Sequence, residues 1–123
     1  MPQTIFVVDD NDINLSLAED ALDETYRVMT LPSAAKMFSF IEKVRPDLIL
    51  LDIEMPEMNG FEALALLKSN DLYKDIPVIF LTGTINESIE TRGYELGAAG
   101  FVVKPFTAPE LLTRVGFILQ AEK

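Results

Sequence analysis

The stretch LILLDIEMPEMNG, residues 48–60, decides the fold. Its first four residues are all apolar, so a strand formed there needs cover on both faces, which is typical of the middle of a parallel sheet. Pro56 cannot continue a sheet ladder and Asn59-Gly60 favours a turn, so the chain leaves as a loop before a helical pattern begins at Phe61. Asp52 is then predicted to be the first residue to leave the core, at the carboxyl end of a strand, where open α/β sheets bind ligands. An Asp in this place can also simply cap a loop, so the rest of the chain decides.

Length and composition restrict the class of protein. The 123 residues are enough for one domain with its own core, so we expect a single domain over residues 1–123. The chain has no Cys for a disulfide or thiolate site, and no His that could act as a phosphodonor or imidazole base. A net charge of −10 argues against direct nucleic-acid binding. No basic leader or long apolar segment is present, which favours a cytoplasmic protein without membrane contact.

Apolar runs alternate with helical patterns along the whole chain. The predicted strands are Ile5–Val8, Tyr26–Thr30, Leu48–Leu51, Val78–Leu81 and Phe101–Val103. The predicted helices cover 13–22, 33–44, 61–69, 87–96 and 108–119, the last with a Thr107…Glu110 capping box. The alternation and the short connections predict an α/β fold, a doubly wound parallel sheet of five strands with five helices. The second strand alternates in polarity and is expected at a sheet edge.

Helical spacing predicts which side chains face the core. The expected inward residues are Ile13, Leu15, Leu17, Ala18, Ala21 and Leu22 in the first helix, Ala34, Met37, Phe38, Ile41 and Val44 in the second, and Leu64, Ala65 and Leu67 in the third. The fourth helix, capped by Asn86 and ended by Gly97, has low helix propensity and little bulk for packing. It is the element most expected to move.

Four of the predicted strands end in a polar group that can take part in chemistry: Asp9-Asp10, Asp52, Thr82 and Lys104. Because parallel strands share one direction, these ends converge at one edge. Clustered carboxylates repel unless a cation compensates, and hard oxygens without His or Cys suit Mg²⁺. With Lys104 as a second cation and Thr82 as a hydroxyl donor, such a site can stabilise a phosphoryl group in transfer, with Asp52 as the nucleophile.

The sequence resembles the receiver domain of two-component response regulators over essentially its whole length. The resemblance rests on four separated motifs in order, namely VDDN (8–11), LLDIEMP (50–56) with Gly60, LTG (81–83), and GA (97–98) leading to KPF (104–106). It implies a flavodoxin-like three-layer sandwich with strand order 2-1-3-4-5.

The resemblance also implies roles for single residues. Asp52 would be the phosphoacceptor, with Thr82 and Lys104 holding the phosphoryl oxygens. The Mg²⁺ ligands would be Asp10, Asp9 through a bound water, Asp52 and the backbone carbonyl of Glu54. Thr82 and Phe101 would be switch residues, although Phe101 can equally be simple packing in an edge strand. The peptide bond between Lys104 and Pro105 would be cis.

The implied function is a phosphorelay switch. A histidine kinase or histidine phosphotransfer protein would donate the phosphoryl group to Asp52, and the chain would catalyse only its own phosphorylation and dephosphorylation. A downstream protein or output domain would bind through the fourth helix, last strand and last helix. The implied state is a monomer or weak homodimer, since Ala99-Gly100 replaces the acidic pair that often supports a charge-paired dimer.

Three other functions fit parts of the pattern. A phosphohydrolase of the haloacid-dehalogenase type also uses a strand-end Asp with Mg²⁺ and a Lys, but it carries a second acid two residues later, which Glu54 matches only loosely. A flavodoxin-like cofactor binder shares the architecture, but no phosphate-cradling loop follows the first strand. A module that binds partners without phosphorylation is the third.

Overall fold

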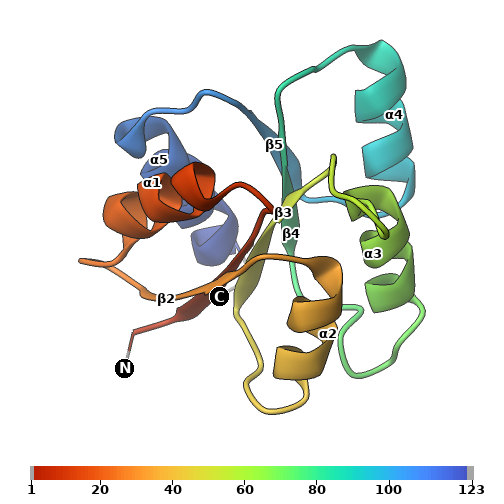
Figure 1. Cartoon of the computed structure of the whole chain (residues 1–123), viewed down its shortest axis with the longest axis horizontal. Coiled ribbons are helices and arrows are strands. Elements are labelled where there is room, and N and C mark those ends of the chain that lie inside the picture. Colours follow the sequence, from red (N-terminus) through yellow and green to blue (C-terminus); the bar gives the residue numbers. More distant parts are fainter. Residues whose placement is uncertain (1, 122–123) are drawn as a thin grey trace.

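The sheet of this protein is built from five parallel strands, within residues 2–121, which are the residues that the computed structural model describes. The strands are Thr4–Val8 (β1), Arg27–Leu31 (β2), Leu48–Asp52 (β3), Val78–Thr82 (β4) and Gly100–Val103 (β5). They lie in the order β2-β1-β3-β4-β5, so the polar-patterned β2 is at an edge (Figure 1). The predicted fold class and strand order are confirmed.

The central strand β3 is buried along its whole length, between β1 and β4. One expectation about its end is wrong. Asp52 is not the first residue to leave the core but the last residue of the strand, paired with Leu81 and only 2% exposed. The ladder continues past it because the Ile53 N–H donates a hydrogen bond to the Leu81 carbonyl oxygen at 3.1 Å. The carboxylate therefore lies inside the protein, at the rim of the sheet.

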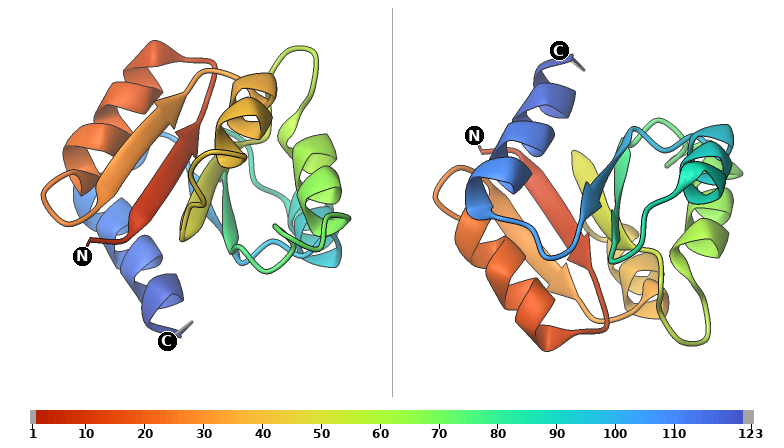
Figure 2. Two further views of the ribbon diagram at one scale, coloured as in Figure 1. Left: turned by 90° about the horizontal axis from the view of Figure 1, so that it is seen from below. Right: turned by 90° about the horizontal axis from the view of Figure 1, so that it is seen from above.

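Helices cover both faces of the sheet and make a three-layer sandwich (Figure 2). One face packs against Asp12–Leu22 (α1) and Ala108–Ala121 (α5), and the other against Ala34–Ile41 (α2), Gly60–Lys68 (α3) and Glu87–Glu95 (α4). Side chains alternate along each strand between the two layers, which is why the central strands are apolar at every position. None of the helices within residues 2–121 combines the length and apolar character needed to cross a bilayer.

Local capping chemistry sets the helix starts. The side chains of Asn11, Ser33, Asn59 and Asn86 each accept a backbone N–H in the first turn of the helix that follows. At the start of α5 the Thr107 hydroxyl accepts the Glu110 N–H, as in the predicted capping box, but Oε1 of Glu110 accepts the Thr107 hydroxyl rather than its backbone N–H. Gly97 ends α4 with a φ of +101°, a conformation that favours glycine.

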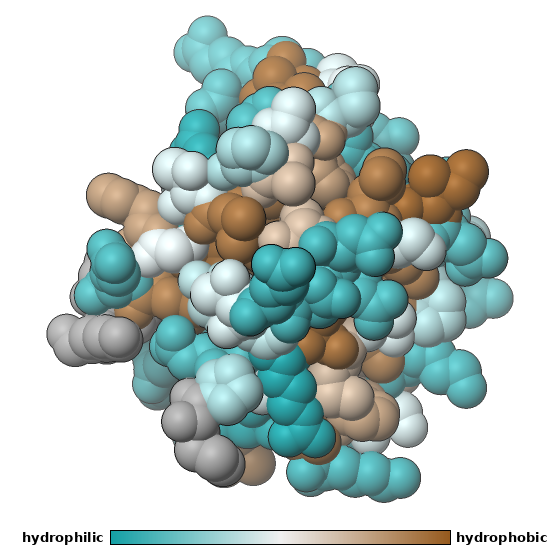
Figure 3. All heavy atoms as spheres, turned by 90° about the vertical axis from the view of Figure 1, so that its left-hand side faces the viewer, coloured by the Kyte–Doolittle hydropathy of each residue, from teal (hydrophilic) through white to brown (hydrophobic). Residues whose placement is uncertain are grey.

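Three of the predicted inward positions are wrong. Ile13 and Leu17 of α1 are 70% and 50% exposed, because only a narrow stripe of this helix meets the sheet and α5. In α3 the inner face includes Ala63 rather than Ala65. Val44 lies beyond the end of α2 at Ile41 but packs against the core, as predicted. Apolar side chains consequently reach the surface on the side where α1 and α5 lie (Figure 3).

Leu22, which is buried, and Leu17, which is half exposed, provide a test of how α1 packs. We expect Leu22→Ala, at a position with 0% exposure, to lower the free energy of unfolding by about 2–5 kcal/mol through lost burial and a cavity. Leu17→Ala is expected to cost less than about 0.5 kcal/mol, because the side chain is half exposed and Ala favours helices. Urea unfolding of both variants measures the difference, and equal losses would contradict the assigned face of α1.

Candidate functional site

The strand ends place polar groups from four strands at one edge of the sheet. Asp9 directly follows β1, Asp52 ends β3, Thr82 ends β4 and Lys104 directly follows β5. The backbone N–H of Lys104 donates to the Thr82 carbonyl oxygen at 2.8 Å, which keeps the lysine beside the neighbouring strand. The following bond to Pro105 is cis, the isomer that the family resemblance implies.

A buried ion-pair cluster forms the centre of this edge. The ammonium Nζ of Lys104 lies 3.0 Å from Oδ1 of Asp52 and 3.3 Å from Oδ2 of Asp9. The two carboxylates are 2% and 0% exposed, and the lysine side chain is 18% exposed. Backbone groups complete the cluster: the Asn11 N–H donates to Oδ1 of Asp9 at 2.9 Å, and the Glu54 N–H donates to Oδ1 of Asp52 at 3.3 Å. Each buried charge is thus paired and hydrogen-bonded.

Three carboxylates at this edge suit a hard divalent cation. Asp9, Asp10 and Asp52 each offer an oxygen, and these oxygens lie within 4.8 Å of one another. Within residues 2–121 one lysine, Lys104, offsets the three acids, and Asp10 is exposed, so bound water can complete a coordination shell. An all-oxygen donor set in a chain without His or Cys is the set that Mg²⁺ prefers. The residues therefore fit the expected ion.

Burial raises the pKa of Asp52, the carboxylic acid at the centre of the cluster. Loss of solvation raises the pKa of Asp52 from 3.8 to about 6, and the charge of Asp9 adds to this effect, while Lys104 and the Glu54 N–H oppose it. For Lys104, burial alone would lower the pKa, but hydrogen bonds and charges from Asp52 and Asp9 outweigh it and raise the pKa. Asp52 is therefore largely ionised at neutral pH, and Lys104 remains a cation.

Neither Thr82 nor Phe101, two predicted site residues, bonds to the ion-pair cluster among the residues that the structure describes. The hydroxyl of Thr82 is buried and donates to the Thr84 carbonyl oxygen at 2.7 Å, so it is engaged in its own turn. Phe101 is 8% exposed and packs on the face of the sheet that α2, α3 and α4 cover, opposite to its neighbour Val102. The Glu54 side chain is exposed, and only its backbone reaches Asp52. A second acid in the manner of the phosphohydrolase alternative is therefore not part of the cluster.

Gly60 is a positioning residue whose close contact with the end of β3 was indicated neither by the turn signal nor by its place in the family motif. Its N–H donates to the Ile53 carbonyl oxygen at 2.8 Å, which draws the start of α3 against the end of β3. A Cβ at this position would lie 2.4 Å from the Asp52 carbonyl oxygen and 2.8 Å from the Ile53 Cα. Glycine is needed here for close backbone approach, and the Asn-Gly pair signals a turn but not this contact.

The fold and the strand-end cluster define a flavodoxin-like α/β domain with a carboxylate and lysine centre. The family model described as the response regulator receiver domain matches residues 5–116. The chain belongs to this family, as its resemblance predicted.

Individual relatives agree with the family. The chain is 40% identical to a probable cyclic di-GMP phosphodiesterase of Vibrio cholerae over 98% of its own length but only 27% of that protein. It is 30% identical to the polar-differentiation response regulator DivK of Brucella anthropi over 94% of both chains. Among solved structures, the Vibrio cholerae chemotaxis protein CheY4 matches with a TM-score of 0.92 and 28% identity, over 96% of this chain and 99% of that one.

The raised pKa of Asp52 predicts how stability changes with pH. Because the folded protein holds this proton more tightly than the unfolded chain, the contribution to stability is fully present below pH 3.8 and is lost as the pH rises through about 6. Asp52→Asn removes the titration. We expect its gain in unfolding free energy over the parent to be larger at about pH 7.5 than at about pH 4, by on the order of 2 kcal/mol. Urea unfolding in EDTA measures this, and a pH-independent difference would contradict it.

A second prediction concerns Gly60, which packs against the backbone of Asp52 and Ile53. Gly60→Ala is expected to lower the free energy of unfolding by about 2 kcal/mol or more, because the new methyl group meets backbone that cannot move aside. Gly83→Ala is the matched control, since a Cβ there has no heavy atom within 4 Å. Denaturant unfolding compares the two, and a neutral Gly60→Ala would show that the loop after β3 is not held by this contact.

Proposed function

We propose that this protein is a phosphoreceiver switch, in which a phosphohistidine of a histidine kinase or phosphotransfer protein gives its phosphoryl group to Asp52. The observation that carries the proposal is the Asp52 carboxylate held by Lys104 beside Asp9 at the open edge of the sheet. Membership of the receiver family supports the same reaction class. Residues 1–123 would act as one receiver domain.

The reaction requires an ionised, accessible carboxylate oxygen. Oδ1 of Asp52 accepts hydrogen bonds from Lys104 and the Glu54 N–H, whereas Oδ2 accepts none from the residues that the structure describes. Oδ2 is thus free to form the new bond to phosphorus while the bond from phosphorus to the histidine nitrogen breaks and its electron pair returns to the imidazole. The Lys104 ammonium would then stabilise the transferred oxygens. Hydrolysis of the aspartyl phosphate by water would return the carboxylate.

Mg²⁺ is the proposed cofactor, held by Asp9, Asp10, Asp52 and the Glu54 carbonyl. When bound, it supplies positive charge that offsets the carboxylates and the incoming phosphoryl oxygens. Asp9 is already fixed by the Asn11 N–H and Lys104, so it is pre-positioned for this role. Asp10 is exposed and can adjust to the ion.

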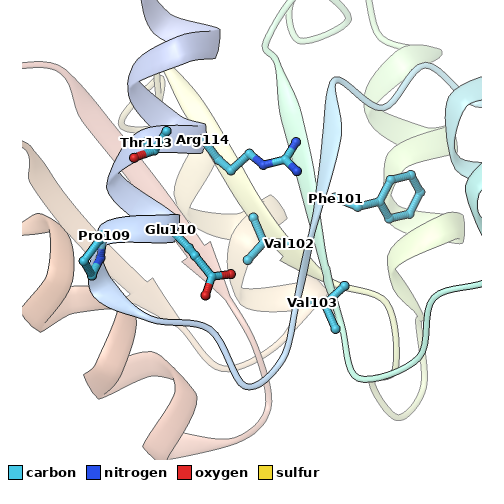
Figure 4. Close-up of a pocket in the computed structure, with 7 residues that line it drawn as sticks. All are labelled: Phe101, Val102, Val103, Pro109, Glu110, Thr113 and Arg114. Atoms are coloured by element: carbon cyan, nitrogen blue, oxygen red, sulfur yellow. The ribbon is translucent and has the colours of Figure 1, made fainter.

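The signal would leave the site through Thr82 and Phe101. A phosphoryl group adds about two negative charges and three acceptor oxygens, which can attract the Thr82 hydroxyl away from Thr84. The partner surface is proposed on α4, β5 and α5, where Tyr94, Val103 and Phe117 are exposed. A groove of about 430 Å³ there is lined by Phe101, Val102, Val103, Pro109, Glu110, Thr113 and Arg114 (Figure 4).

The cellular location, oligomeric state and partners of the protein are also part of the proposal. We expect a cytoplasmic monomer or weak homodimer that meets its kinase and its downstream protein directly, without nucleic acid or membrane contact, in keeping with the acidic charge of the chain. The phosphodiesterase activity in the name of the Vibrio cholerae relative is not proposed here, because the chain spans 27% of that protein. The chain would catalyse only its own phosphorylation and dephosphorylation.

Phosphorylation by acetyl phosphate with Mg²⁺ tests the proposal. Intact mass and peptide mapping should show one phosphoryl group on Asp52, lost in Asp52→Asn and kept in the control Asp12→Asn, whose exposed carboxylate is outside the cluster. Lys104→Met should slow the reaction by about tenfold to a hundredfold, because a cation at the transferring oxygens is lost. Labelling that survives Asp52→Asn at the parental rate would overturn the assignment of the acceptor.

A further inference from the structure

The dipeptide Asn59-Gly60, where the β3–α3 loop meets α3, joins two residues with separate structural roles (Figure 1). The Asn59 side chain caps α3 by accepting the Glu62 N–H at 2.9 Å, and the Glu62 carboxylate accepts the Asn59 N–H at 3.0 Å. Gly60 is buried, and its missing side chain leaves room for the Asp52 carbonyl oxygen. The capping requirement and the packing requirement together place asparagine directly before glycine.

Asparagine followed by glycine is the dipeptide most prone to spontaneous loss of the side-chain amide. The backbone nitrogen of the following residue can attack the side-chain carbonyl carbon Cγ, and glycine has no Cβ that would hinder the approach. Of the five asparagines in the sequence, only Asn59 is followed by glycine. The close contact that requires Gly60 therefore also creates a chemically reactive dipeptide.

The folded conformation opposes this reaction in two ways. Ring closure requires the Gly60 nitrogen to eclipse Cβ of Asn59, but at the observed ψ of 173° that nitrogen is anti to the Asn59 nitrogen and gauche to Cβ. The Gly60 N–H, whose proton must leave before attack, is buried and donates to the Ile53 carbonyl oxygen at 2.8 Å. Rotation into the reactive geometry breaks this bond, so the reaction requires the junction between the loop and α3 to open.

The turn just before Asn59 favours such an opening. The Met58 N–H donates to the Pro56 carbonyl oxygen at 2.8 Å, which closes a three-residue turn around Glu57. Glu57 has a φ of 68°, which is the conformation of the rare and strained form of this turn. Because opening releases this strain, it offsets part of the hydrogen bonding that is lost. The junction can thus open while the rest of the domain stays folded.

We propose that Asn59 is a site of spontaneous deamidation, and that local opening of the β3–α3 junction sets its rate. In the open state the Gly60 nitrogen loses its proton to solvent and forms a bond to Cγ of Asn59. The bond from Cγ to Nδ2 breaks, and Nδ2 takes up a proton and leaves as ammonia. Water then opens the cyclic imide at either carbonyl carbon, and the electron pair of the broken carbon–nitrogen bond stays on nitrogen. One opening gives aspartate, and the other gives isoaspartate.

The two products differ in their effect on the fold. Aspartate caps a helix about as well as asparagine, so this product keeps the start of α3. Isoaspartate carries the main chain through Cγ and adds a methylene to it at residue 59, which displaces Gly60 from the Asp52 carbonyl oxygen. The isoaspartate form therefore loses the contact that positions the loop after Asp52. This change is covalent, and it does not require phosphorylation.

Incubation at neutral pH and physiological temperature, with and without urea, tests the assignment of the site. Peptide mapping with a protease that cleaves before aspartate but not before isoaspartate measures both products. We expect Asn59 to be the first asparagine to react in the folded protein, at a rate at least about tenfold below its rate in urea. Equal rates in the two conditions, earlier reaction at another asparagine, or a folded protein that never reacts at Asn59 would each overturn the proposal.

The route through local opening is tested with variants of the cap and of the distant core. Glu62→Ala removes one bond of the cap and should speed deamidation of the folded protein by about threefold relative to Glu62→Gln, which can still accept the Asn59 N–H. Leu22→Ala lowers stability from the opposite layer and should leave the rate within about twofold of the parent. Equal rates in the two Glu62 variants, or a Leu22→Ala rate that rises with the unfolded population, would overturn the local route.

The effect of the added methylene is measured on the isoaspartate form, purified by chromatography after incubation. Asn59→Asp is the matched control, since it carries the same new charge on an ordinary main chain. We expect the unfolding equilibrium constant of the isoaspartate form to exceed that of Asn59→Asp by about tenfold or more, as measured by urea unfolding. Equal constants would contradict the displacement of Gly60.

Discussion

Burial of the Asp52 carboxylate is the constraint on which the site depends. A carboxylate with 2% exposure cannot be left without a partner, because an unpaired buried charge costs several kcal/mol. Lys104 supplies the partner, but Asp9 shares the same ammonium, and Asp10 adds a third acid. The cluster therefore retains an excess of negative charge at the edge where a ligand can enter. An arrangement of this kind is stabilised by cations and is also one that a phosphoryl group alters strongly.

The parallel arrangement of the strands brings the residues of this cluster together. Every strand runs in the same direction, so residues distant in sequence meet at one edge without long loops. The cost is that the central strands need apolar cover on both faces, which the two helical layers supply. Close approach then matters at the edge itself, where Gly60 lets α3 begin directly beside the backbone of Asp52. Close packing at this edge therefore both buries Asp52 and fixes the position of the loop between β3 and α3.

Much of this arrangement could be predicted from the sequence, because it depends on local patterns. Continuous apolar runs locate β1, β3 and β4, and the polar residues that end them identify the edge group. Helical periodicity wrongly assigns Ile13 and Leu17 to the core, because it does not reveal how wide a stripe of α1 the sheet and α5 cover. The contacts of Gly60 with the end of β3 and of Gly93 with Phe101 could not be predicted, since each depends on the approach of an element from elsewhere in the chain. The state of the Thr82 hydroxyl likewise depends on the conformation of its turn.

The weak attachment of α4 is consistent with a switch of limited energy. An aromatic pair contributes about 0.5–1.5 kcal/mol and an exposed cation–π contact about 0.5–1 kcal/mol, so the cation–π contact of Arg92 and the aromatic contact of Tyr94 are together worth only a few kcal/mol. A unit charge near a protein surface interacts with another 4 Å away by about 4 kcal/mol. Moving a population almost completely requires about 5.5 kcal/mol of differential interaction. A helix anchored by several large buried side chains would exceed that scale. Within Glu87–Glu95 only Gly93 is buried, so α4 is the weakly anchored helix of this layer.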